Sequence, residues 1–462
     1  MAAAIAPLLI ALASFVLRLV NLGATKGYIF DEVYYVDGAR DLLKYGVEVS
    51  GSNPEFIVHP PVGKWLIAAG IAIFGDNEFG WRFATALVGT LLILVFARLI
   101  HVLFYSPVLT GLGAALMALD GLLLVHSRTA LLDLFLTFFV LLGVLLWHRD
   151  RHWWAGLAFG LALGCKWSAI YFIAVIALIA VYRILVNMDI RDSFKLLAKK
   201  FAQYGLLPIA VYVITWMGWF MSDRGWDRQS SSNPLIAWLN YHAEMLNFHT
   251  GLTESHPYQA NPWSWLVMGR PTSFFYDSPT DCGAKNCARE VLALGTPILW
   301  WMGTIAIAVV IGYWIKSLVN RHTDSAAQIV SIGIIAGYLP WFAMQQRTVF
   351  TFYAIALYFS MIWGLFYYSV FSTNLVSIKK SISLFFLTQL LIFILVDIAR
   401  IPQIHPLYAL TKPNLGFLEH LIGYTFGVGV FEEFVKLLPV YLLIRKSKEP
   451  LIPQTVVFYG LM

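Results

Sequence analysis

Two adjacent carboxylates, Asp31 and Glu32, lie in the stretch YIFDEVYYVDGARD, a few residues after the first apolar segment of the chain. A carboxylate near a membrane surface can accept a proton from an attacking hydroxyl group and act as a general base. Partial burial would raise its pKa and make it a stronger base. Asp37 and Asp41 follow closely, so the residues alone leave four candidates for this role, and all four could simply be solvated.

Cationic residues recur in three later motifs. His59 and Lys64 belong to HPPVGKW, Arg82 to GWRF, and Arg128 and Asp133 to SRTALLD. Arginine and lysine beside a carboxylate suit group transfer from a lipid phosphate, because they neutralise the phosphate as it leaves. Single cations at a membrane interface also serve as anchors, and Arg128 with Asp133 could form a structural ion pair.

A divalent metal is the main alternative chemistry for these acids. Asp31, Glu32, His59 and Asp133 are possible metal ligands, as in membrane glycosyltransferases with a D-x-D motif. Here the two acids are adjacent, and the neighbouring cations already supply positive charge. We therefore predict no required metal and no cofactor.

The elements that must position these residues are membrane spans. The chain has 462 residues, of which 59% are hydrophobic and 13% charged, whereas soluble proteins carry about a quarter charged residues. The deficit extends over the whole chain and predicts an all-α polytopic membrane protein. Apolar runs lie near 4–22, 83–105, 107–125, 129–147, 153–165, 167–187, 204–222, 295–315, 326–344, 348–370 and 381–398, with further segments after 415.

Basic clusters orient these spans. Lys and Arg gather at 148–152, 191–200, 315–322, 377–380 and 445–448, and threading the spans in order puts all five clusters on one side. The positive-inside rule makes that side cytoplasmic, so the acidic stretch and the arginine motifs lie on the outer face. Positive charge distributed in this way records membrane orientation, and we predict no binding to nucleic acid.

The three cysteines differ in their surroundings. Cys165 lies in an apolar run and is expected to be inert. Cys282 and Cys287, in DCGAKNC, are close enough to form a small disulfide loop if this segment faces an oxidising space. A metal site would need more ligands than this segment offers.

Several motifs together resemble the protein O-mannosyltransferase family. FDEVYYVDGARDLL, HPPVGKWLIAAGIAIFGDNEFGWRF and SRTALLDLFLTFF match it in order, and FHTGLTESHPYQANPWSWLVMGRPTSFFYDSPTDCGAKNC is similar to the bacterial, actinobacterial-type members. The resemblance spans roughly 5–370. It implies a GT-C bundle of roughly 11–13 transmembrane helices with a catalytic first external loop.

The resemblance also implies an activity. Members transfer mannose from polyprenyl-phosphate mannose to Ser or Thr of secreted proteins near the Sec channel, with inversion, at the outer face of the bacterial plasma membrane. By position, Asp31 would be the base and Glu32 its support. The residues expected to bind the lipid donor are Arg82, Arg128, Lys64 and His59. The residues expected to have supporting roles are Asp133, His249, Glu254, His256, Trp263 and Trp265.

The region 371–462 departs from this pattern and is expected to be a separate part, with one further span and a tail. Glu432, Glu433 and Lys436 form E-E-x-x-K, which resembles the first motif of PrsW-type intramembrane glutamic proteases, although a Glu pair one turn from a Lys also suits a plain helix. Alternative functions are therefore a GT-C transferase that moves another sugar, such as arabinose, to lipid or glycan, and an intramembrane protease. A non-catalytic scaffold or transporter is a further alternative.

Overall fold

Apolar sequence runs form the long helices of the structure, which is a computed structural model. It describes residues 2–187, 190–279, 287–320, 324–357 and 364. The chain divides into two units, Met1–Tyr368 and Ser369–Met462, and every feature below belongs to the first. Cys282 and the E-E-x-x-K residues Glu432, Glu433 and Lys436 lie outside the described residues, as does all of 371–462 with its predicted span.

The first half of the chain forms α1 to α9. Their bounds are α1 Ala2–Leu19, α2 Glu32–Tyr45, α3 Val62–Phe74, α4 Glu78–Phe104, α5 Pro107–Leu119, α6 Gly121–His126, α7 Leu132–His148, α8 His152–Leu163 and α9 Ala169–Asn187. Two short strands, β1 (Val49–Ser50) and β2 (Asn53–Pro54), pair between α2 and α3.

The second half continues the bundle. Its helices are α10 Ile190–Phe201, the π-helical η1 Ala202–Leu206, α11 Leu207–Thr215, α12 Met217–Met221, α13 Pro234–Gly251, α14 Pro297–Val319 and α15 Ser325–Gly337. Three 3₁₀ helices are η2 Pro262–Ser264, η3 Leu339–Met344 and η4 Thr351–Leu357. Strands β3 (Thr272–Asp277) and β4 (Arg289–Ala293) form an antiparallel ribbon.

Four of the helices that the structure describes are long and apolar enough to cross a membrane. They are Glu78–Phe104, Ala169–Val186, Leu299–Val319 and Ser325–Met344, and the shorter apolar helices are Ile5–Leu19, Val62–Phe74, Pro107–Leu119 and Leu132–His148. The predicted total of 11–13 spans includes residues outside the described part and stays a prediction.

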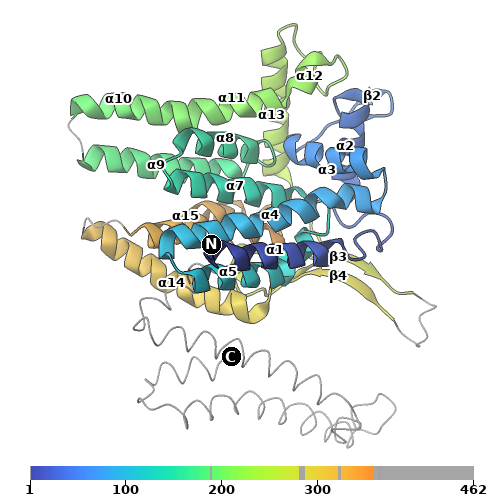
Figure 1. Cartoon of the computed structure of the whole chain (residues 1–462). Helices are drawn as coiled ribbons and strands as arrows, with labels where there is room; N and C mark the ends of the chain where they lie inside the picture. The colour runs from blue at the N-terminus through green and yellow to red at the C-terminus, as the bar shows by residue number, and fades with distance from the viewer. Residues whose placement is uncertain (1, 188–189, 280–286, 321–323, 358–363, 365–462) are drawn as a thin grey trace, which may run out of the picture. The chain divides into compact units, whose positions relative to one another are not determined.

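The long helices run side by side, and α2, α3 and the β3–β4 ribbon lie at one end of them (Figure 1). Helix α4 packs against α1, α3, α5 and α7, while α7 packs against α8, and α8 against α11. The core of the unit therefore surrounds α4, which contains Arg82, and α7, which contains Asp133. Polar segments from distant parts of the sequence meet where these two helices begin.

The predicted span 107–125 is wrong in one respect, because the structure breaks it at Asp120. The backbone of Asp120 is extended, and its side chain accepts a hydrogen bond from the Leu123 amide at the start of α6. Its other oxygen accepts from the Thr296 amide at 2.9 Å and from the Trp300 indole at 3.2 Å. A buried carboxylate with these three donors is satisfied only if the helix stops here.

Helix α3 was expected to be part of an external loop, whereas it forms a tight hairpin with α4. A Cβ atom on Gly70 would lie 2.3 Å from the carbonyl oxygen of Gly80, which is shorter than any tolerated contact. The two backbones can approach this closely only without a side chain at position 70. This crossing brings the HPPVGKW motif against the helix that contains Arg82.

Gly70→Ala should therefore destabilise the protein by about 1–3 kcal/mol, because the added methyl group meets rigid backbone. The measurement is the midpoint of thermal unfolding in detergent, which should fall by several degrees. Gly111→Ala on α5 is the matched control, since its Cβ would meet only Ala6 at 3.7 Å. Equal melting temperatures for the two variants would contradict this account of the hairpin.

Candidate active site

Asp31 lies at the start of α2, and its carboxylate makes no hydrogen bond to the end of that helix. The Tyr35 hydroxyl, one turn further along, donates to Asp31 Oδ2 at 3.4 Å. Phe30 precedes it with φ of +52°, in the left-handed region that non-glycine residues rarely adopt. The chain thus turns sharply before the carboxylate, which stays available for chemistry.

An aromatic cluster holds this turn in place. The ring of Phe30 stacks on Phe274 of β3 with centroids 4.9 Å apart, and it meets Phe350 and Phe352 edge-on at 5.7 and 5.5 Å. His256 packs against Phe30 at 6.2 Å. Such ring contacts stabilise the unusual backbone conformation, because moving Phe30 would expose several buried faces at once.

Glu32 is completely buried and joins three segments of the chain. Its Oε1 accepts from Nε of Arg82 and from the Ala130 amide, and its Oε2 accepts from Nη2 of Arg82 and from the Ile29 amide, all at 2.8 Å. A carboxylate offers about four acceptor positions, and all are occupied here. These contacts make Glu32 a residue that positions the first loop, and its predicted support of Asp31 stays a prediction.

The N–H donors of the Arg82 guanidinium are likewise all occupied. Nε and Nη2 donate to Glu32, Nη2 also donates to the Gly27 carbonyl at 2.8 Å, and Nη1 donates to the carbonyls of Thr25 at 2.8 Å and Leu22 at 3.3 Å. A guanidinium has five N–H donors, so none remains for a phosphate. In this geometry Arg82 has no N–H group left for the predicted contact with the phosphate of the donor lipid. Its contacts instead hold the first loop.

Lys166, which the sequence reasoning did not select, completes the site. Its ammonium lies between α8 and α9 and contacts both carboxylate oxygens of Asp133, at 2.8 and 3.0 Å. Both side chains interact electrostatically with Asp31. In the sequence, the signal for Lys166 was the CKW motif, which places a single cation at the end of an apolar run. An ion pair between Asp133 and Arg128 was one alternative left open by the sequence, and the structure pairs Asp133 with Lys166.

The Asp31 carboxyl has a pKa raised to about 6. Burial is the main cause, because it disfavours the charged form, and the negative charge of Asp133 adds to it. The positive charge of Lys166 and the Tyr35 hydrogen bond act in the opposite direction. The result is a carboxylate that is ionised at neutral pH and more basic than a solvated one.

Arg128 lies in the turn before α7 and is half-buried. Its Nη1 donates to the carbonyls of Leu17 and Arg18 at the end of α1, both at 2.9 Å. Within the described part of the chain, no hydrogen bond from its Nε or Nη2 is found. Among the predicted donor-binding residues, Arg128 is thus one that retains unused guanidinium donors.

Lys64 is fully buried and forms an ion pair with Glu48, and it donates to the backbone carbonyl of His59 at 3.0 Å. These contacts anchor the first loop rather than present the ammonium to a lipid. The centroid of the His59 ring lies 5.9 Å from that of Tyr35 and 5.4 Å from that of His249, between the Lys64–Glu48 ion pair and Asp31. Burial lowers the pKa of His59 well below its usual value, so its imidazole is neutral.

His249 of α13 is fixed by contacts on both ring nitrogens, Nε2 with the Val58 carbonyl at 2.8 Å and Nδ1 with Nη2 of Arg347 at 3.2 Å. Burial and the Arg347 charge lower its pKa to about 4. The neutral ring therefore donates from Nε2 and accepts at Nδ1. It holds the loop beside His59, in keeping with the predicted supporting role.

The remaining predicted supporting residues lie further out. The Glu254 side chain is exposed, and Trp263 is 71% exposed, packing on Phe342. Trp265 is fully buried and donates to the Ala260 carbonyl at 2.8 Å, so it is a packing residue. Cys287, near the ribbon, is disulfide-bonded, while its predicted partner Cys282 lies outside the described residues.

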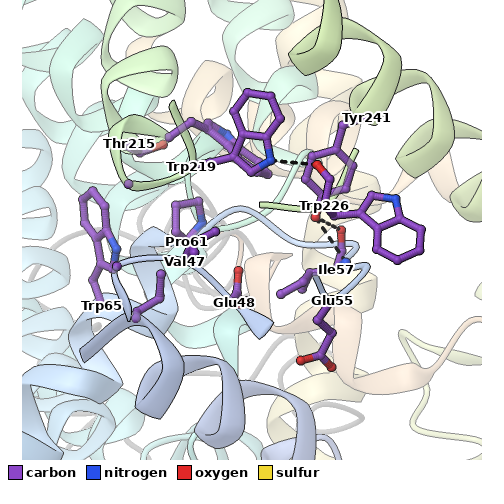
Figure 2. A pocket seen from close by; sticks show the side chains of 14 residues that line it. Val47, Glu48, Glu55, Ile57, Pro61, Trp65, Thr215, Trp219, Trp226 and Tyr241 are labelled. Carbon is purple, nitrogen blue, oxygen red and sulfur yellow. Dashed lines mark hydrogen bonds between the residues drawn. The ribbon is translucent and has the colours of Figure 1, made fainter. Parts of the chain in front are cut away.

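A small recess borders the segment that precedes α3 (Figure 2). Glu48, Glu55 and Trp65 line it together with Trp219, Trp226 and Tyr241. Its volume of about 20 Å³ suits one water molecule and is too small for a sugar ring. The Tyr241 hydroxyl donates to the Ile57 carbonyl at 2.8 Å, so this wall fixes the loop that precedes His59.

No group of three or more His, Cys, Asp or Glu side chains that could hold a metal ion is found among the described residues. In the predicted alternative set, Glu32 is enclosed by Arg82, and Asp133 is bound to Lys166. Ammonium and guanidinium groups occupy the positions that a cation would take. The residues present do not fit a metal site.

Solved structures identify the fold. The Saccharomyces cerevisiae Pmt1-Pmt2 protein O-mannosyltransferase complex bound to the sugar donor matches with a TM-score of 0.66 at 14% identity, covering 95% of this chain and 90% of that one. ArnT from Cupriavidus metallidurans in the apo state matches with a TM-score of 0.54 at 17% identity, covering 98% and 74%. The chain therefore has the fold of these multi-pass membrane proteins, and the predicted GT-C fold is confirmed.

Sequence comparison identifies the family. Residues 58–219 match the dolichyl-phosphate-mannose-protein mannosyltransferase family, and 235–404 match the C-terminal four-transmembrane region of protein O-mannosyltransferases. The polyprenol-phosphate-mannose–protein mannosyltransferase of Mycobacterium tuberculosis is 34% identical over 76% of this chain and 77% of its own length. The chain belongs to this protein mannosyltransferase family, as predicted, and its likeness extends to residue 404, beyond the predicted limit of 370.

Glu32→Gln should lower stability by about 3–5 kcal/mol and abolish activity, because Arg82 would remain buried without a counter-charge. Thermal unfolding in detergent measures the first effect. Asp76→Asn is the matched control, since its ion pair with Arg40 is largely exposed and should contribute less than about 1 kcal/mol. A Glu32→Gln protein as stable as the control would show that the buried pair does not hold the loop.

Proposed function

We propose that this protein transfers mannose from polyprenyl-phosphate mannose to Ser or Thr hydroxyl groups of secreted proteins. Asp31 acts as the general base at the outer face of the bacterial plasma membrane. The observation that carries the mechanism is the placement of Asp31, a partly exposed carboxylate with raised pKa beside the Lys166–Asp133 pair. The similarity to the mycobacterial mannosyltransferase supports the choice of donor and acceptor.

The reaction is a single displacement. The acceptor hydroxyl gives its proton to the Asp31 carboxylate as its oxygen forms a bond to the anomeric carbon of mannose. The bond between this carbon and the phosphate oxygen breaks, and polyprenyl phosphate leaves with the electron pair. Attack from the face opposite the leaving group inverts the anomeric configuration.

The negative charge that develops on the phosphate requires a cation. Arg128 has unused donors, and Lys166 supplies a positive charge within the site while it remains bound to Asp133. We assign Arg128 to the donor phosphate and His59 to a neutral hydrogen bond in the same region. Glu32, Arg82 and Lys64 keep the first loop in the geometry that the reaction needs.

The distribution of charge supports the proposed outer-face location. The basic clusters between the spans lie opposite the loop that contains Asp31 when the spans are threaded in order. Proteins emerging from the Sec channel would present their side chains on that face. Transfer of an arabinose-type sugar is the alternative function. It is supported by 37% identity over 127 residues to the undecaprenyl phosphate-alpha-4-amino-4-deoxy-L-arabinose arabinosyl transferase of Pseudomonas aeruginosa, and an assay offering both lipid-linked sugars distinguishes the two.

Mannose transfer should depend on pH through Asp31. Because the base acts as a carboxylate, kcat/KM should fall tenfold per pH unit below about 6 and reach a plateau above it. The measurement uses membranes with labelled polyprenyl-phosphate mannose and a Ser/Thr-rich peptide. Asp31→Asn should lower transfer at least about 100-fold, and transfer that survives this change would exclude Asp31 as the base.

Substitutions of Lys166 and Asp133 should shift the pH profile of kcat/KM in opposite directions. Lys166→Gln removes a charge that lowers the pKa of Asp31, so the midpoint should rise above 6. Asp133→Asn removes a charge that raises it, so the midpoint should fall below 6. The double variant should return towards the wild-type value. Shifts of the same sign in both single variants would contradict the proposed arrangement.

A further inference from the structure

His126, the last residue of α6, is a buried polar group that the proposed mechanism does not use. Its side chain is completely buried, and neither ring nitrogen has a hydrogen-bond partner in the part of the chain that the structure describes. Buried polar groups in proteins nearly always have partners, so an imidazole with two unused nitrogens requires an explanation. A ligand that enters the site would provide one.

The position of His126 connects it with Asp31. Its ring lies 5.5 Å from Phe274 and 5.6 Å from Phe352, measured between centroids. These two rings also hold Phe30, the residue directly before Asp31. In addition, His126 interacts electrostatically with Asp133 and Lys166, the pair beside the base. The imidazole therefore borders the same region as the general base.

The chemistry of the ring indicates the ligand. Burial lowers the pKa of His126 to about 4, so the ring is neutral and presents one N–H donor and one acceptor. A phosphate oxygen only accepts hydrogen bonds, so it could pair with the N–H nitrogen of the ring but not with the acceptor nitrogen. A hydroxyl group both donates and accepts, and the neighbouring phenyl rings offer apolar surface to the C–H groups of a sugar.

We propose that His126 hydrogen-bonds a hydroxyl group of the sugar being transferred and thereby helps to select that sugar. The inference rests on the proposed function and extends it to sugar recognition. Because the ring is enclosed, binding of the donor must separate His126 from Phe274 or Phe352. His126 is then a specificity-determining residue that contacts the substrate, distinct from the base.

The experiment combines His126→Phe with polyprenyl-phosphate mannose and its four monodeoxy analogues, each lacking one of the 2-, 3-, 4- or 6-hydroxyl groups. In the wild type, one analogue should lose about tenfold or more in kcat/KM through loss of the bond to His126. In His126→Phe, the penalty for that analogue should shrink to within about twofold, while the other penalties stay unchanged. Identical penalties in both proteins for all four analogues would overturn the proposal.

Two controls separate this role from a structural one. His126→Asn keeps a donor and an acceptor and should recover most of the activity that His126→Phe loses. Binding of sugar-free polyprenyl phosphate should be the same in wild type and His126→Phe, and a loss of this binding would instead indicate a structural or phosphate-binding role and overturn the proposal.

A binding measurement distinguishes failure of the proposed mannose transfer from failure of the inference about His126. If the wild type transfers no mannose, direct binding of the five lipid-linked sugars to wild type and His126→Phe still tests the inference. A deoxy penalty on binding that disappears in the variant would support recognition by His126. Penalties that persist unchanged would reject it.

Discussion

The buried ion pair between Glu32 and Arg82 is the interaction on which the end of the helix bundle around Asp31 depends. Burial of two charges is costly and is tolerated only when both are fully hydrogen-bonded. Here the five donors of Arg82 and the acceptor positions of Glu32 are all used, by each other and by backbone groups of the first loop and of the turn before α7. The carboxylate of Asp31 adjoins this rigid unit and can itself remain free of structural bonds.

Two neighbouring acids thus have different roles because their surroundings differ. Glu32 is surrounded by hydrogen-bond donors and holds three segments of the chain together. Asp31 has one long hydrogen bond from Tyr35, and its buried environment disfavours the negatively charged carboxylate. The positive charge of Lys166 lowers the pKa of Asp31 and favours its ionised form, and Lys166 is itself paired with Asp133. Burial, one cation and a second acid together determine the pKa of Asp31.

The sequence allowed much of this site to be predicted, because charged residues are rare in so apolar a chain. Asp31, Glu32, Arg128 and Asp133 could be assigned to one end of the bundle from span order alone. Their partners could not be predicted, since the rotation of each helix decides whether Asp133 meets Arg128 or Lys166. Likewise, only tertiary contacts with Thr296 and Trp300 reveal that Asp120 ends a helix within an apolar run.

The aromatic cluster around Phe30 has a consequence for how the protein is made. Phe30 belongs to the first loop, yet the rings that hold it, Phe274, Phe350 and Phe352, lie more than half the chain further on. Membrane proteins are synthesised from the N-terminus, so the loop is complete long before its anchors exist. The nascent chain therefore carries an incompletely packed first loop until the ribbon and η4 have been translated.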